Sequence, residues 1–537
     1  MQTDHAIAGS IKDAQTPCAK THIDIRGLSK TFDTPTGSIE VLNDVNLLIS
    51  RGEFVSILGA SGCGKSTLLK VIAGIEKPTS GEVLFDSPDS SKKRCAVVFQ
   101  SNSLFPWRSA LDNVSFGPEQ SGYSIVDARK IGRKWLKHVG LDQFIDYYPH
   151  QLSGGMQQRV NLARAFAYDA DIILMDEPFS AVDALTRRNL QKLLIELSEQ
   201  YQKTVIYVTH SADEAILMSD RIAFLTNKTG GIHSIHSVNV PRPRLQHADL
   251  DSSATPDSLK GQLWKEMISQ NAEASNLQFE SSSHNKNKIG VWQALWLPIL
   301  VLSIWEFLAR FGMVDQLFWP APTHQFMMLI QQLANGNLIP DTLATMSRML
   351  TTLFLSIIIG GGVGFAMGLS PRIRNALYPT VAALYPIPKI VILPFCMLIF
   401  GIGPTSLIAL GTIAASFLIL MNTFAGVMNV PMDIVMAGKI YGANKFQLVS
   451  KVILPAALPF IFVGIRLGMG MALAVMVASE FIASDDGLGY TVWTSWQILD
   501  MDTMFPAIII VTFIGVMFHH GMKWIEKKYL PWQKGRN

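Results

Sequence analysis

The residues best suited to chemistry lie in a glycine-rich run from Gly59 to Thr67. A short apolar stretch, 53–58, precedes this run and a helix-like stretch, 67–73, follows it, which is the context that a phosphate-binding loop needs. Glycines let backbone N–H groups close around an anion, and the start of the helix adds a positive dipole end. The run therefore predicts a nucleotide site, and the residues expected to line it are Gly59, Ser61, Gly62, Cys63, Gly64, Lys65, Ser66 and Thr67.

Two acids, Asp176 and Glu177, end the apolar stretch 172–175. A pair of carboxylates is costly to bury without partners. In a site of this kind Lys65 is expected to reach the β- and γ-phosphates and Ser66 to hold Mg²⁺. We therefore expect Asp176 to bind the same Mg²⁺ and Glu177 to act as the base that polarises water.

Two further apolar stretches end in a polar side chain. The stretch 95–99 ends at Gln100, which could reach a metal ion or the attacking water, although a single glutamine is usually a surface residue. The stretch 205–209 ends at His210, and one histidine in such a place is more often structural than catalytic.

Two other positions have both a chemical and an ordinary interpretation. Ser153, Gly154 and Gly155 stand at the start of a helix and could form a second anion site or a simple cap. Phe32 lies between two strand-like stretches, where an aromatic ring could stack on a nucleotide base or close the end of a strand.

The chain has 537 residues, more than one ordinary domain needs. Hydrophobic residues make up 49% and charged residues 16%, a low charged share for a soluble protein. The first 230 or so residues mix charged and apolar residues like a soluble α/β domain, whereas long apolar runs begin near residue 291. We expect an α/β P-loop ATPase at 21–235, a linker at 236–290 and an all-α polytopic membrane domain at 291–533.

The remaining composition narrows the class further. The four cysteines lack the spacing of a disulfide framework or metal site, which favours a reduced cytosolic setting. A net charge of +3 gives no indication of a nucleic-acid partner. The first 20 residues are polar, so we expect no signal peptide there. Residues 236–290 are rich in polar residues and predict a partly disordered linker.

A membrane-spanning helix needs about 20 apolar residues to cross about 30 Å of hydrocarbon. Six stretches qualify, and the third holds four prolines, so it could be broken; glycines in the second suit close helix packing. The predicted spans are about 291–310, 343–369, 377–400, 405–429, 456–480 and 505–524.

Lysine and arginine give the orientation of these spans. They follow the second, fourth and sixth spans and are absent from the connections 311–342, 401–404 and 481–504. Basic residues mark the cytoplasmic side, so we expect the ATPase domain and the C-terminus in the cytoplasm. Four ionisable residues lie in or near spans, where such groups are often functional. Three are cations, which would favour an anionic solute unless they extend to the interfaces; the four are Arg348, Lys389, Arg466 and Glu480.

Taken together, the motifs of residues 21–230 resemble an ATP-binding cassette (ABC) ATPase. The order carries the resemblance: the phosphate loop, Gln100, the Leu-Ser-Gly-Gly run at 152–155, Asp176-Glu177, the stretch 180–183 and His210. The resemblance implies Mg²⁺ and ATP as cofactors, catalytic roles for Glu177, Gln100 and His210, and metal contacts from Ser66, Gln100 and Asp176. It also implies nucleotide contacts from Phe32 and Asp183.

The same resemblance implies a head-to-tail pair of cassettes with two ATP molecules between them. Ser153, Gly154 and Gly155 would then contact ATP held by the second copy. The stretch 104–107, Leu-Phe-Pro-Trp, is similar to a Leu-Pro-Trp stretch of nitrate, sulfonate and taurine importers, on the surface that meets their membrane domain.

The second half of the chain resembles the permeases of the same importers over about 291–533. The stretch 437–455 is similar to the cytoplasmic coupling loop of importers, which exporters lack, and Gly442 and Pro455 match its pattern. Met436 stands where the family has an acid, which puts a salt bridge to the cassette in doubt. Further similarity lies at 400–403, 480–483 with 487–490, and 530–532.

The resemblance implies a fused half-transporter of the plasma membrane that works as a homodimer with an extracytoplasmic solute-binding protein. Its solute would be a small anion such as a sulfonate, taurine or nitrate. The alternatives are an importer of a vitamin precursor, an exporter, and a soluble cassette ATPase.

Overall fold

The computed structural model describes residues 21–34, 37–86, 95–101, 103–226, 230–238 and 291–533. The chain divides into two compact units. The first comprises residues 1–278 and 431–452, and the second comprises 279–430 and 453–537. Almost all of the predicted linker, 236–290, lies outside the described residues. The exact domain bounds therefore stay a prediction.

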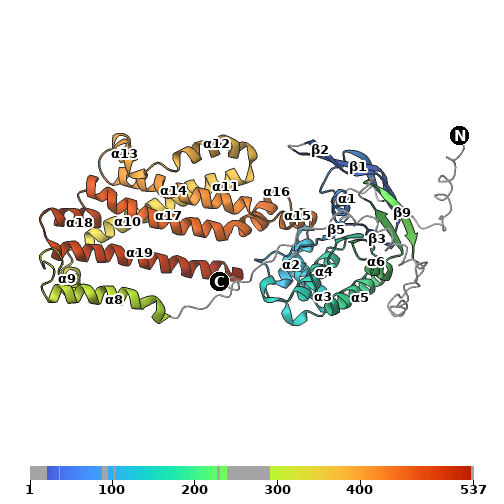
Figure 1. The fold of residues 1–537 in the computed structure, drawn as a ribbon, viewed down its shortest axis with the longest axis horizontal. Helices are drawn as coiled ribbons and strands as arrows, with labels where there is room; N and C mark the ends of the chain where they lie inside the picture. The colour runs from blue at the N-terminus through green and yellow to red at the C-terminus, as the bar shows by residue number, and fades with distance from the viewer. Residues whose placement is uncertain are drawn as a thin grey trace. The chain divides into compact units, whose positions relative to one another are not determined.

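The first unit is built on a six-stranded sheet in the order β5-β6-β7-β3-β8-β9, whose first five strands are parallel and whose last is antiparallel (Figure 1). Its inner strands are buried along their whole length, which explains why they appear in the sequence as continuous apolar runs. The strands are β3 (Phe54–Leu58), β5 (Cys95–Val98), β6 (Ile172–Asp176), β7 (Thr204–Thr209), β8 (Arg221–Leu225) and β9 (Ile232–Ser237).

A second, antiparallel sheet in the order β2-β1-β4 completes the strands of this unit. It contains β1 (Thr21–Thr34), β2 (Gly37–Ser50) and β4 (Ser80–Phe85). The longer helices of the unit are α1 (Lys65–Ile72), α2 (Ala110–Gln120), α3 (Ile125–His138), α4 (Gly154–Ala167), α5 (Ala184–Gln200) and α6 (Ala212–Met218).

The parallel strands determine where the predicted site residues lie. The carboxyl ends of parallel strands meet at one edge of a sheet, where ligands of α/β folds bind. The glycine-rich loop follows β3, Gln100 follows β5, Asp176 ends β6 and His210 follows β7. Residues far apart in the sequence therefore reach one edge.

The second unit is helical, and α10, α14, α17 and α19 run side by side along it (Figure 1). A π-helical segment, Ile357–Gly361, joins α10 to α11. The helices are α8 (Val291–Arg310), α9 (Pro322–Ala334), α10 (Ile339–Ser356), α11 (Gly362–Leu369), α12 (Pro371–Leu384), α13 (Leu393–Phe400), α14 (Pro404–Met428), α17 (Leu454–Ala483), α18 (Leu488–Gln497) and α19 (Met501–Tyr529).

Four helical stretches among the described residues are long and apolar enough to cross a membrane: Ile339–Leu369, Pro404–Met428, Lys445–Ala483 and Met501–Tyr529. They correspond to four of the six predicted spans. The predicted third span is a pair, Pro371–Leu384 and Lys389–Phe400, bent by 98°. The break contains Pro386 and Pro388, whose missing N–H groups cannot continue a helix. The predicted first span corresponds to helix α8, which is not one of these four stretches.

The glycines of the second predicted span allow two helices to approach closely. A Cβ atom on Gly360 would overlap the backbone of Ser416, and one on Gly364 would overlap the backbone of Leu420. Both partners lie on α14, one turn apart, so the prediction of glycine-mediated packing is confirmed at these two positions.

Candidate nucleotide site and the permease segment beside it

The glycine-rich loop ends in helix α1, whose first turn is free of side-chain caps. Its N-cap residue, Gly64, has φ +97°, a left-handed conformation that suits glycine. The Lys65 ammonium lies within the loop and donates hydrogen bonds to the carbonyls of Gly59 (2.8 Å) and Ala60 (2.7 Å). Backbone donors at a helix start together with a lysine give the loop the donor set that a phosphate chain requires.

Cys63, also in this loop, is buried. Burial raises the pKa of its thiol, although the neighbouring Lys65 opposes this. The thiol therefore remains protonated and gives the site no nucleophile.

Asp176 and Ser66 provide a place for a hard cation. The Asp176 side chain is buried and its Oδ1 atom has no hydrogen-bond partner. Burial raises the pKa of this carboxyl, and a hydrogen bond with Ser66 opposes the rise. A buried carboxylate oxygen without a partner is costly, and a bound Mg²⁺ would satisfy it. The residues thus fit the predicted metal, because a hydroxyl and a carboxylate are oxygen ligands of the kind that Mg²⁺ prefers.

Glu177 brings two other predicted residues together. Its Oε2 atom accepts a hydrogen bond from Gln100 Nε2 (3.2 Å) and lies 3.1 Å from His210 Nδ1. Its backbone has φ +42°, a strained conformation for a residue with a Cβ, of the sort found at functional sites. Two side chains that follow β5 and β7 therefore converge on one oxygen atom of Glu177, which follows β6.

The other predicted nucleotide contacts have local partners. The Lys30 ammonium lies 4.7 Å from the centre of the Phe32 ring. Ser153 caps α4 by accepting from Met156 N, and Asp183 caps α5 by accepting from Thr186 N. Ser153 and Gly154 are exposed. Their contacts with nucleotide stay predictions.

The permease segment 431–452 belongs to the first unit and contains two short helices, α15 (Met432–Ile440) and α16 (Lys445–Leu448). Trp107 donates its indole N–H to the Lys451 carbonyl (3.1 Å), and Ser101 donates to the Asp433 carboxylate. Met436 packs against the apolar core of the unit. Met436 therefore makes an apolar contact where the resemblance predicts an acid, and Asp433 contributes a polar contact.

Sequence reasoning missed Asp433, Tyr441 and Arg164. Tyr441 is fully buried, and its hydroxyl donates to the Val97 carbonyl (3.0 Å). Arg164 is also fully buried, with its guanidinium 4.8 Å from the centre of the Tyr441 ring. The sequence signal that could have identified Tyr441 is its position, since it is a large aromatic residue immediately before the loop glycine, Gly442.

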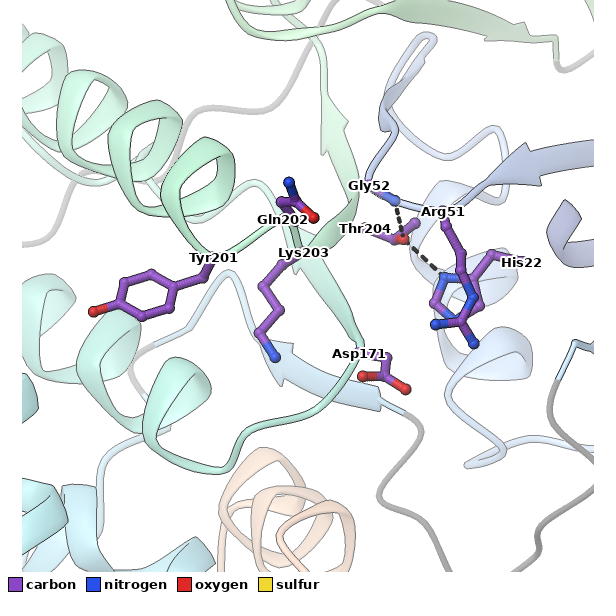
Figure 2. Close-up of a pocket in the computed structure, with 8 residues that line it drawn as sticks. All are labelled: His22, Arg51, Gly52, Asp171, Tyr201, Gln202, Lys203 and Thr204. Atoms are coloured by element: carbon purple, nitrogen blue, oxygen red, sulfur yellow. Dashed lines mark hydrogen bonds between the residues drawn. The ribbon is translucent and has the colours of Figure 1, made fainter. Parts of the chain in front are cut away.

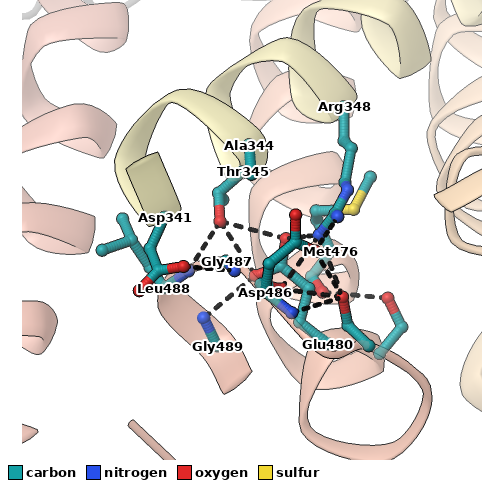
Figure 3. Close-up of polar contacts among 12 residues, drawn as sticks. Asp341, Ala344, Thr345, Arg348, Met476, Glu480, Asp486, Gly487, Leu488 and Gly489 are labelled. Atoms are coloured by element: carbon teal, nitrogen blue, oxygen red, sulfur yellow. Dashed lines mark hydrogen bonds and ion pairs between the residues drawn. The ribbon is translucent and has the colours of Figure 1, made fainter. Parts of the chain in front are cut away.

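The four ionisable residues that the sequence singles out in the second unit have protein partners, which the sequence did not reveal, and their part in the transport path stays a prediction. Arg348 forms ion pairs with Glu480 and Asp486 (Figure 3). Arg466 pairs with Glu526. Lys389 donates to the carbonyls of Leu384, Tyr385 and Ile387, at the end of α12. The two arginines are thus neutralised, and the lysine caps a helix.

A separate polar pocket of about 420 Å³ lies in the first unit (Figure 2). It is lined at the starts of β3, β6 and β7 by Gly52, Asp171 and Thr204, and by His22 from β1. The predicted nucleotide residues lie at the opposite ends of these strands, so this pocket is separate from them.

Comparison with known proteins agrees with this geometry. The family model described as ABC transporter matches residues 42–180. The model described as binding-protein-dependent transport system inner membrane component matches residues 323–530.

Three curated relatives match the first part of the chain. An uncharacterized ABC transporter ATP-binding protein of Methanocaldococcus jannaschii is 45% identical over 227 residues, covering 42% of this chain and 85% of that protein. An aliphatic sulfonates import ATP-binding protein of Bacillus cereus is 40% identical over 229 residues, covering 42% and 90%. A taurine import ATP-binding protein of Roseobacter denitrificans is 43% identical over 236 residues, covering 43% and 84%.

These matches confirm the predicted fold class, the use of ATP, and ATP hydrolysis coupled to membrane transport. The chain therefore belongs to the ABC transporter family, and it joins an ATP-binding cassette and a binding-protein-dependent permease domain in one polypeptide.

Proposed function

We propose that the chain is one half of an importer that uses ATP to take up a small anion such as a sulfonate, taurine or nitrate. The observation that carries the proposal is the pairing, in one polypeptide, of a cassette similar to sulfonate and taurine import ATP-binding proteins with a permease of the binding-protein-dependent class. That class supports import with an extracytoplasmic solute-binding protein rather than export.

In the proposed ATPase cycle, Lys65 and the first turn of α1 bind the phosphates of ATP. Ser66 and Asp176 hold Mg²⁺, which neutralises phosphate charge when bound. Glu177 accepts the proton of the attacking water, while Gln100 and His210 keep its carboxylate oriented through the contacts at Oε2. Because the base is strained and pre-positioned, little reorganisation accompanies hydrolysis.

The arrangement also supports a second copy of the chain as partner. The chain carries one phosphate loop and one Leu-Ser-Gly-Gly run. The run's Ser153 and Gly154 are exposed at the start of α4. A homodimer would place each run on the ATP of the other copy and give two equivalent sites. The basic residues after the even-numbered predicted spans support a plasma-membrane orientation with the cassette in the cytoplasm.

One structural observation favours a second class of solute. The two arginines of the second unit are paired with acids, and Lys389 caps a helix. Two arginines whose charge is balanced by acids suit a neutral or cationic solute, such as a vitamin precursor, as well as an anion.

An uptake experiment separates these solutes. Cells lacking this gene are given labelled taurine, alkanesulfonates, nitrate and thiamine precursors one at a time, and are complemented with the wild type or with Lys65→Ala as the inactive control. We expect loss of uptake of one of the anions, restored by the wild type alone. If only the uptake of a vitamin precursor is lost, the result contradicts the anion proposal but still supports an importer. If a carbonate wash releases the protein from the membrane, the result contradicts the proposal that it is a membrane transporter.

A further inference from the structure

Tyr441 is the most deeply inserted aromatic residue of the permease segment 431–452. That segment connects α14 with α17 along the chain, yet Tyr441 is fully buried among residues of the cassette. Its hydroxyl donates to the Val97 carbonyl on β5. Among the described residues, strand β5 is an edge strand with β6 as its one neighbour. An edge strand depends on donors from outside the sheet to hold its position, and the permease supplies one here.

Strand β5 leads directly to the catalytic groups. It ends at Val98, and Gln100 follows two residues later with its amide 3.2 Å from the Glu177 carboxylate. A displacement of β5 would therefore move Gln100 relative to Glu177. Among the described residues, the Tyr441 hydroxyl contacts neither Gln100 nor Glu177. It therefore acts on this pair through the strand.

The ring of Tyr441 contacts a different part of the cassette. Arg164 lies against the ring, and it donates to the Ser103 carbonyl (2.9 Å), the Ser103 hydroxyl (2.7 Å) and the Asn161 side chain (3.1 Å). Its Nε atom has no hydrogen-bond partner, and no acid pairs with it in the described part of the chain. A buried cation without an acid gains from an aromatic face. Arg164 belongs to α4, the helix that Ser153 begins.

We propose that Tyr441 is a positioning residue that links the permease to both halves of the ATP machinery at once. Its hydroxyl holds the strand that leads to Gln100, and its ring holds the helix that begins at Ser153. A nucleotide-driven movement of either element thus reaches the segment 431–452 through one side chain. The inference rests on the proposed function, because it assumes a transporter driven by ATP.

The test uses the full-length chain in lipid nanodiscs and compares hydrogen–deuterium exchange with and without ATP plus orthovanadate. Tyr441→Phe removes the hydroxyl, with its bond to Val97 and its electrostatic contact with Arg164, and keeps the ring on Arg164, whereas Tyr441→Leu removes the ring contact as well. Tyr201→Phe is the matched control, because its hydroxyl bonds to His138 elsewhere in the cassette. ATPase kinetics are measured on the same samples.

We expect Tyr441→Phe to keep the KM for ATP within about twofold of the wild type. It should lose about half or more of the nucleotide-induced change in exchange at 431–452. Tyr441→Leu should abolish the response at 431–452, and Tyr201→Phe should match the wild type.

A Tyr441→Phe variant that responds like the wild type overturns the inference. If Tyr441→Leu does not fold, Tyr441→Phe alone decides the question, since it removes one exchangeable donor and no volume from the core. A wild-type chain that neither hydrolyses ATP nor responds to it overturns the proposed function and this inference with it. If the wild type responds to ATP and Tyr441→Phe shows the same response at 431–452, the inference is overturned and the proposed function stands.

Discussion

Arg348 and Glu480 form a buried ion pair in the second unit, with Arg348 Nη1 2.9 Å from Glu480 Oε1. The Glu480 carboxylate also accepts from Thr345 Oγ1 (2.9 Å) and from the backbone N–H of Gly489 (2.9 Å) (Figure 3). A Cβ atom on Gly487 would lie 2.6 Å from Glu480 Oε1. The Gly487-Leu-Gly489 stretch thus leaves room for this carboxylate, and the motif is a structural unit that ties α10 to α17 and α18.

Removing one partner of this pair should be much more costly than removing both. Arg348→Met alone leaves the buried Glu480 carboxylate without its cation, which costs about 3–5 kcal/mol, whereas Glu480→Gln leaves Arg348 with Asp486 as its remaining acid. The double variant should be destabilised by less than the sum of the two. Thermal unfolding of the full chain in detergent measures this in a double-mutant cycle. Lys389→Met is the control, because it removes a cation that has no acid partner in the described residues. Strictly additive effects would show that the pair is not coupled.

Replacing the catalytic base should separate ATP binding from hydrolysis. Glu177→Gln keeps the shape and an oxygen for Gln100 and His210 but removes the base. Hydrolysis should fall about 10²–10⁴-fold while ATP still binds and holds two chains together. Lys65→Ala is the contrasting variant, and it should weaken ATP binding itself. Nucleotide binding, turnover and chain mass measured on both variants check this. Near wild-type turnover by Glu177→Gln would show that another group is the base.

The sequence predicted that three of the candidate side chains lie together, because each follows an apolar strand, and their roles toward ATP stay predictions. Gln100, Glu177 and His210 follow β5, β6 and β7, and the parallel order of these strands brings them to one edge. The local proline pattern likewise predicted the broken third span, which the structure bends by 98°.

Contacts between distant segments could not be predicted in this way. The Tyr441–Val97 hydrogen bond joins positions 344 residues apart, and the Arg348–Glu480 pair joins positions 132 apart. Periodicity indicates that a residue is buried but not which residue it meets. For this reason the sequence left two interpretations of the intramembrane arginines, a solute contact or an extension to the interface, and did not reveal the acids on neighbouring helices.

The cassette should lose stability in acid partly through His22. This side chain is 5% exposed and its Nδ1 lies 2.8 Å from Thr204 Oγ1 (Figure 2). Burial lowers the pKa of His22, and the Arg51 cation lowers it further, whereas Asp171 and Asp86 oppose this. The unfolded chain thus binds a proton more readily than the folded one. Stability from this group is complete above the ordinary histidine pKa of about 6.5 and falls as the pH drops from there toward the lowered folded value.

His22→Gln should reduce the loss of stability on acidification, because glutamine does not titrate. Exchange protection of the β7 backbone, measured in the full chain at about pH 7.5 and about pH 5.5, reports the change near this histidine. His150→Gln, at an exposed position, is the control. An equal loss of protection in His22→Gln and the wild type would assign the acid sensitivity to other groups.

Bulky side chains at Gly442 should uncouple transport from ATP hydrolysis. Gly442 has φ +89°, so any substitution strains the backbone by about 1–2 kcal/mol. Its Cβ position also lies 3.4 Å from Gln120 Cβ and 3.6 Å from the Tyr168 hydroxyl, both in the cassette. Alanine adds strain alone, whereas leucine must also push the segment 431–452 away from α2 and α4. Coupling losses of about 0.5–2 kcal/mol correspond to roughly 2- to 30-fold less uptake per ATP hydrolysed.

Gly336→Leu is the matched control for this prediction. Gly336 has φ +78° and no atom within 4 Å of its Cβ position, so leucine there adds similar strain without crowding the cassette. Uptake of the solute found by the panel and ATPase activity are measured for each variant in proteoliposomes. We expect Gly442→Leu to keep its ATPase activity and lose uptake, Gly442→Ala to be intermediate, and Gly336→Leu to keep both. Normal uptake by Gly442→Leu would mean that another contact, with Trp107–Lys451 the nearest example in the same segment, carries the coupling.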